Sequence, residues 1–133
     1  MRPEAADYLG KARQCLDEAK QIAAQLSLHH IVAREAYFAA YHAAAAYLFE
    51  RTGKTAKTHR GLRSEFARLA RNEPRIHREY LTFLAEAYEY KSIADYAAGP
   101  ATLSIGAADA SSAVGTASRF IDCIAELLSE SPV

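Results

Sequence analysis

The sequence of 133 residues lacks tryptophan and contains one methionine, two cysteines, four prolines and six glycines. The cysteines, Cys15 and Cys123, are far apart and have no CxxC spacing, which excludes a disulfide framework and indicates small core residues in a reducing compartment. No run of about 18 apolar residues is present, so we expect no membrane-spanning helix. The N-terminus contains acidic residues and no apolar run, so we expect no signal peptide and a cytoplasmic location.

Several catalytic and cofactor motifs are also missing. The sequence has no GxGxxG or GxxxxGK[ST] loop, which excludes the usual dinucleotide and P-loop sites. It has no HExxH zinc motif and no GxSxG nucleophile elbow. His29 and His30 are neighbours that point to different faces of a helix, so they do not indicate a zinc site. We therefore expect neither a metal nor a cofactor.

Net charge is also missing, because 16 basic residues balance 16 acidic ones. The charges are unevenly distributed, however. Residues 51–78 contain nine Lys or Arg and two acidic residues, a balance of 9 − 2 = +7, and the rest of the chain has the opposite balance, 7 − 14 = −7. This segment can create a local positive field, or it can simply form solvated helix faces.

The pattern of apolar residues predicts helices throughout. Apolar residues recur at intervals of three and four, as the buried face of a helix requires. The expected helices span about residues 3–26, 28–51, 58–73, 74–98 and 104–129, with Pro3 in the first turn, Ser27 and Thr58 as N-caps, and Gly53 and Gly99–Pro100 as stops. We predict an all-α single domain over residues 1–133, an antiparallel up-and-down four-helix bundle with one extra short helix.

Polar residues interrupt the apolar stripe of the second expected helix. Arg34 lies one turn before Tyr37 and Phe38, and His42 lies one turn after Phe38. Either these side chains form a site, or the Arg34 stem extends to solvent and His42 bonds to a backbone or tyrosine group.

The stretch KTHRGL, residues 57–62, lies where the third helix is expected to begin. Thr58 is a plausible N-cap, and His59 and Arg60 fall in the first turn, where free backbone N–H groups favour anions. Lys57 adds a positive charge just before the helix. The segment is therefore a candidate phosphate site, although capping alone also explains Thr58.

The stretch YKSIADY, residues 90–96, carries the third candidate. Lys91 and Asp95 are four residues apart, in the less favourable order for a surface pair on a helix. Lys91 also falls on the predicted apolar stripe, with Leu84 and Ala87. These features favour an internal polar network or a subunit interface.

Three motifs in this order resemble the HEPN superfamily, in particular its small single-domain branch. They are Arg-x-x-Tyr-aromatic-Ala-x-aromatic-His-Ala at residues 34–43, Lys-x-His-x-Gly-Leu at residues 57–62, and a basic residue, two others and then Ala-Asp-Tyr at residues 91–96. The resemblance implies a helical bundle, a homodimer and a minimal nucleotidyltransferase partner. It also implies a toxin–antitoxin role, with metal-independent RNA cleavage by an Arg, four to six residues, then His. In some pairs the partner transfers AMP to a nearby tyrosine.

This sequence departs from that motif, because Lys91 and Tyr96 stand where active members have arginine and histidine. Metal-independent cleavage needs a base for the 2′-hydroxyl, an acid for the leaving oxygen and a cation on the phosphate. Lys91 can supply the cation, but a tyrosine is a poor base at neutral pH. His59 or His42 can substitute if the fold brings one of them near.

Three hypotheses follow. The first is a ribonuclease whose catalytic residues are Lys91, Asp95, Tyr96 and His59. The second is a non-catalytic protein that binds a nucleotide, or that is the partner or substrate of a nucleotidyltransferase with Tyr96 as AMP acceptor. The third is a helical scaffold whose polar residues serve packing. The candidate phosphate, nucleotide or RNA contacts are Arg34, Tyr37, His42, Lys57, Thr58 and Arg60.

Overall fold

The computed structural model describes residues 1–96 and 104–130. The helices are α1 (Pro3–Gln25), α2 (His29–Thr52), α3 (His59–Ala70), α4 (Arg78–Glu86), α5 (Tyr88–Tyr96) and α6 (Ala107–Ser129). The described part of the chain contains no strand, so the prediction of an all-α protein is confirmed. No helix in that part is long and apolar enough to cross a membrane.

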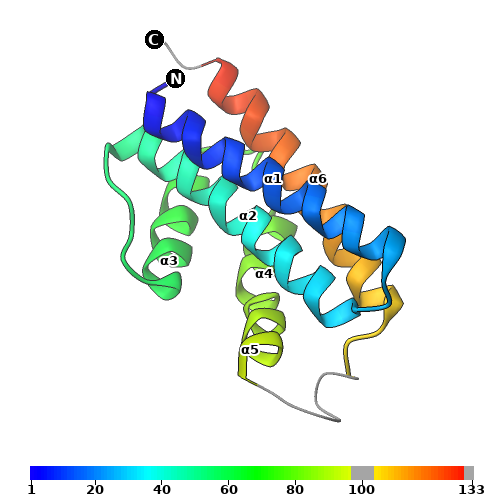
Figure 1. The fold of residues 1–133 in the computed structure, drawn as a ribbon. Coiled ribbons are helices and arrows are strands. Elements are labelled where there is room, and N and C mark those ends of the chain that lie inside the picture. The colour runs from blue at the N-terminus through cyan, green and yellow to red at the C-terminus, as the bar shows by residue number, and fades with distance from the viewer. Residues whose placement is uncertain (97–103, 131–133) are drawn as a thin grey trace.

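Helix α2 is the centre of the fold and contacts each of the other five helices. Figure 1 shows the long helices α1, α2 and α6 side by side, with α3, α4 and α5 packed below them. The position of α2 follows from its alanines, since Ala39, Ala40, Ala43 and Ala44 are all fully buried. Small side chains all round a helix let neighbouring helices pack closely against every face.

Most helix ends follow from local chemistry. The Thr58 hydroxyl accepts a hydrogen bond from the Gly61 N–H at 2.9 Å, as predicted for an N-cap. Gly53 ends α2 with φ at 73°, a conformation that favours glycine. The prediction of Ser27 as an N-cap is wrong, because α2 starts one residue later, after Leu28, whose side chain cannot cap. Residues 26–28 instead form the turn between α1 and α2.

The predicted fourth helix differs most from the structure. It begins at Arg78, after turns in which the N–H of Glu73 bonds to Ala70 and the N–H of Ile76 bonds to Glu73. It is also interrupted at Ala87, where the Tyr90 N–H bonds to the Ala87 carbonyl in a tight turn before α5 continues. Two short helices, α4 and α5, therefore stand where one long fourth helix was predicted, and the predicted end of that helix at residues 98–100 lies outside the described residues.

The last helix begins at Ala107, whereas the sequence suggested Ser104. The Asp109 carboxylate accepts a hydrogen bond from the Gly106 N–H at 3.0 Å, which fixes this start. Of the apolar positions predicted to face inward from this helix, Ala113, Ala117 and Ile124 are buried and Val114 is partly buried.

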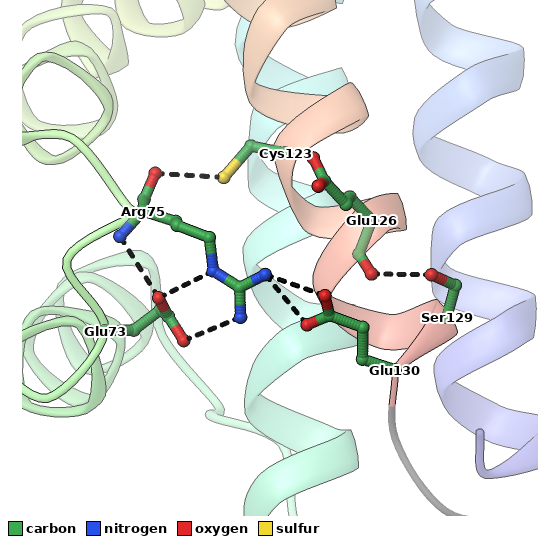
Figure 2. Close-up of polar contacts among 6 residues, drawn as sticks. All are labelled: Glu73, Arg75, Cys123, Glu126, Ser129 and Glu130. Atoms are coloured by element: carbon green, nitrogen blue, oxygen red, sulfur yellow. Dashed lines mark hydrogen bonds and ion pairs between the residues drawn. The ribbon is translucent and has the colours of Figure 1, made fainter.

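Arg75 links the connection between α3 and α4 to the end of α6, as Figure 2 shows. Its guanidinium donates to Glu73 at 3.0 Å and to Glu130 at 2.8 Å. The Cys123 thiol of α6 donates to the Arg75 carbonyl at 3.3 Å. Cys123 and Cys15 are free, partly buried and packed against the core, and burial raises the pKa of both thiols.

Candidate functional site

Helices α2, α3 and α5 bring polar residues together on one side of the core. Helices α3 and α5 both contact α2, so residues about 60 positions apart in the sequence become neighbours. The group, called the His59 cluster below, consists of Arg34 and Tyr37 from α2, His59 and Arg63 from α3, and Tyr88, Lys91 and Asp95 from α5. Five of these seven residues were candidates from the sequence, and they come from three separate motifs: Arg34, Tyr37, His59, Lys91 and Asp95.

Asp95 joins two cations. One of its oxygens lies 2.6 Å from Arg34 Nε, and the other lies 3.0 Å from Lys91 Nζ. Arg34 also pairs with Glu35 at 2.7 Å. Burial alone would raise the pKa of Asp95, but the hydrogen bonds from Lys91 and Arg34 hold it below its ordinary value. Asp95 is therefore ionised at neutral pH, and it orients the two cations rather than supplying a proton.

His59 is bound to a buried tyrosine. Its Nδ1 lies 2.6 Å from the hydroxyl of Tyr37, a side chain with no exposed surface. The imidazole also packs against Tyr41 and Tyr88, with ring centres 4.6 and 5.2 Å away. Burial raises the pKa of Tyr37, so this hydroxyl stays protonated and acts as a hydrogen-bonding group. The ring of His59 is thus held in a fixed orientation.

The surroundings of His59 disfavour its charged form. Burial lowers its pKa first, and the positive charges of Lys91 and Arg63 lower it further, while Asp95 acts in the opposite direction. The imidazole is therefore neutral at pH 7. A neutral imidazole beside two cations can donate or accept one hydrogen bond at the edge that faces away from Tyr37.

Arg63 and Tyr88 were not among the residues predicted from the sequence. Arg63 lies one helical turn after His59, and its guanidinium carbon is 5.2 Å from the centre of the Tyr88 ring. Its Nη1 is buried and has no hydrogen-bond partner in the described part of the chain. The spacing of four residues between His59 and Arg63 was the available signal, since it places both on one helix face.

Two predicted residues lie at the margins of the cluster. Tyr96 is 79% exposed, and its ring centre is 5.0 Å from Lys91 Nζ. His42 stacks on Phe38, and its Nδ1 is buried without a hydrogen-bond partner among the described residues. The pKa of His42 is lowered by burial, then by the charges of Lys11 and His59.

The remaining predicted residues surround the start of α3. The Thr58 hydroxyl serves the helix cap, Lys57 is exposed, and Arg60 lines a groove of about 300 Å³ between α3 and α4 together with Arg63. The structure therefore does not bring these three side chains into contact with Asp95. Within residues 1–96 and 104–130, no group of three His, Cys, Asp or Glu side chains could hold a metal ion.

Comparison with known proteins gives one positive result. No curated protein matches the chain significantly. The family model of the HEPN domain matches residues 5–128, a range that contains the His59 cluster and nearly all of the chain. HEPN proteins share a helical fold, in agreement with the structure. The chain therefore belongs to the HEPN domain family.

Proposed function

We propose that this HEPN-domain protein binds RNA through its phosphate backbone at the His59 cluster, as the RNA-directed member of a toxin–antitoxin or nucleotidyltransferase-associated pair. The supporting observation is the neutral imidazole of His59 beside two cations, Lys91 and Arg63. Ammonium, guanidinium and imidazole N–H groups are the donors that phosphate oxygens accept from most strongly.

The charge balance also supports a phosphate ligand. Within the cluster and its neighbour Glu35, three cations face two carboxylates, a balance of 3 − 2 = +1. The basic segment 51–78, with its balance of +7, contains both His59 and Arg63. A phosphate can therefore compete with Asp95 for Lys91 or Arg34, and the segment adds long-range attraction for the RNA backbone.

Cleavage of the bound RNA is a narrower hypothesis than binding. In that reaction the 2′-oxygen attacks phosphorus and the bond from phosphorus to the 5′-oxygen breaks. A base takes the proton of the 2′-hydroxyl, and an acid gives a proton to the leaving 5′-oxygen. Two candidate bases interact with Lys91: the charge of Lys91 acts on His59, and the Tyr96 ring, 5.0 Å from Lys91 Nζ, occupies the place of the histidine in active relatives. We therefore propose binding as the function and let the same samples test cleavage.

The experiment measures binding of a labelled single-stranded oligoribonucleotide in the presence of a chelator. We expect binding that weakens steeply with added salt and weakens at least fivefold in Lys91→Ala. Lys20→Ala, an exposed lysine on α1, is the matched control and should bind like the wild type. Absence of binding, or equal effects of the two substitutions, would refute the proposal.

Electrophoresis of the same samples shows whether the RNA is cut. Shortened RNA that disappears in His59→Ala would establish the ribonuclease hypothesis. Competition by ATP or AMP would show whether a free nucleotide occupies the site, because it offers the same phosphate chemistry.

A second candidate function is favoured by the exposure of Tyr96, whose hydroxyl is accessible to another protein. In this function a nucleotidyltransferase transfers AMP to Tyr96: the tyrosine oxygen attacks the α-phosphorus of ATP, pyrophosphate leaves, and the hydroxyl proton passes to solvent. Incubation with the partner enzyme and ATP should add the mass of one AMP group, and Tyr96→Phe should abolish this. Modification of another tyrosine alone would contradict it.

We also propose that two copies of the chain pair, as the family resemblance implies. Light scattering after size exclusion should give the mass of a dimer, and a monomer at micromolar concentration would exclude this. If Lys91→Ala changes the oligomer mass and no RNA or nucleotide binds, the scaffold hypothesis is the correct one.

A further inference from the structure

The hydroxyl of Tyr37 bonds to His59 and interacts with the charge of Arg63. It is 2.6 Å from His59 Nδ1, and the charge of Arg63 acts directly on it, opposing the rise in pKa that burial causes. Tyr37 has no exposed surface, so its hydroxyl has to satisfy its hydrogen bonds inside the protein. Arg63 and Tyr37 both pack against Tyr88, with the guanidinium carbon 5.2 Å and the Tyr37 ring centre 5.9 Å from the centre of the Tyr88 ring. Arg63 Nη1 is buried without a hydrogen-bond partner among the described residues.

These three groups determine which atom donates. A guanidinium has donors only, so it cannot accept the Tyr37 hydroxyl proton, and its positive charge attracts the oxygen and repels the hydrogen. The hydroxyl hydrogen therefore points away from Arg63, toward His59 Nδ1. In a neutral imidazole one nitrogen accepts and the other carries the proton, so the proton of His59 must be on Nε2.

We propose that Arg63 is a positioning residue that, through the Tyr37 hydroxyl, holds His59 as the neutral tautomer with its proton on Nε2. What this N–H binds depends on the proposed function, in which it donates to an RNA phosphate oxygen. The tautomer itself is a property of the free protein and does not depend on any ligand.

The tautomer has a chemical consequence. With a proton on Nε2 and a hydrogen bond at Nδ1, His59 has no free lone pair to take the proton of a 2′-hydroxyl. The site then holds a phosphate by donation from His59 and Lys91 and does not activate an attack on it. Protonation of His59 at Nδ1 is also unfavourable, because the new N–H and the Tyr37 O–H would then be two donors pointing at each other.

The groups that face His59 come from all three helices, and they agree with this assignment. Helix α2 contributes the uncharged rings of Tyr37 and Tyr41, and its His42 interacts electrostatically with His59. Helix α3 contributes Arg63. Helix α5 contributes Tyr88, Lys91 and Asp95. Asp95 is the carboxylate in this set, and Arg34 and Lys91 bind both of its oxygens. Asp95 therefore has no free oxygen with which to stabilise the doubly protonated, charged form of His59.

The test is nitrogen NMR of the histidine-labelled protein near pH 8, with His59→Gln to assign the signals. We expect His59 to show a protonated Nε2 and an Nδ1 that accepts a hydrogen bond. In Arg63→Met, which removes the charge but keeps an unbranched side chain, the two signals should shift toward averaged values. Arg63→Lys, which keeps the charge, should restore much of the wild-type pattern. In Tyr37→Phe the hydrogen-bond shift at Nδ1 should disappear.

A wild-type His59 with its proton on Nδ1 would overturn the proposal, and so would a pattern unchanged in folded Arg63→Met. If a variant does not fold, the wild-type spectrum alone still shows which nitrogen of His59 carries the proton. RNA binding is measured separately: the predicted tautomer without RNA binding would refute only the proposed function, and RNA binding with the opposite tautomer would refute only this inference.

Discussion

Lys91 and Asp95 act on the same imidazole in opposite directions. The charge of Lys91 lowers the pKa of His59, after the larger effect of burial, and the charge of Asp95 raises it. Lys91→Ala should therefore move the pKa of His59 up toward 6.5, and Asp95→Asn should move it further down. The measurement is an NMR titration of the His59 ring in each variant. Shifts of the same sign in both variants would show that the side chains act by packing and not by charge.

The sequence indicated part of this residue-scale arrangement. Lys91 and Asp95 are one helical turn apart, so their pairing follows from helix geometry. The bond from Arg34 to Asp95 spans 61 positions and depends on how α2 packs against α5, which no local pattern specifies. The sequence does not single out Arg63, because a basic residue on an amphipathic helix usually faces solvent.

At the scale of single helices, the start of α3 depends on one hydroxyl. Thr58→Ala removes the cap to the Gly61 N–H and should lower the free energy of unfolding by about 0.5–2 kcal/mol. Thr58→Ser keeps the oxygen and should be close to the wild type. Urea denaturation measures both. Equal stability of Thr58→Ala and wild type would show that water replaces the cap without cost.

Gly61 gives a second test of the same helix start. A Cβ at this position would lie 2.9 Å from the Thr58 hydroxyl oxygen, so Gly61→Ala should displace the cap. Its effect should largely disappear in the Thr58→Ala background, because the cap is already absent there. Additive losses of stability in the double variant would contradict this coupling.

The Arg75 contacts predict a local effect. Arg75 and Glu130 are exposed and Glu73 is partly exposed, and ion pairs of solvent-exposed groups contribute little to stability. Arg75→Ala should therefore leave the denaturation midpoint nearly unchanged but speed amide hydrogen exchange in residues 71–77. Unchanged exchange there would mean that the turn holds its own conformation without α6.

Local sequence patterns predict some of the helix ends correctly and miss others. Thr58 and Gly53 were predicted correctly, because caps depend on residues close in sequence. Ser27 has the right chemistry but is one position too early, since residues 26–28 are needed to reverse the chain between α1 and α2. The interruption at Ala87 has no helix-breaking residue, so helix propensity does not predict it; we attribute it to the packing of α4 on α2 and α6 and of α5 on α2.

For the whole molecule, the histidines predict a pH dependence of stability. His42 and His59 both have a pKa lowered below 6.5, chiefly by burial, so the unfolded chain takes up protons before the folded one as the pH falls. Stability should therefore decrease as the pH drops below about 6.5 and level off below the folded pKa. Thermal unfolding of the wild type and of His42→Gln/His59→Gln measures this. An equally steep decrease in the double variant would assign the effect to carboxylates instead.

RNA binding at the His59 cluster is the central proposal for the whole molecule. The most direct measurement is a titration of histidine-labelled protein with a single-stranded oligoribonucleotide, in chelator, following all ring signals by NMR. We predict that the His59 signals shift progressively and saturate, while those of His77, an exposed residue at the start of α4, stay in place. Unchanged His59 signals under conditions in which the RNA is bound would place the RNA elsewhere and contradict the account.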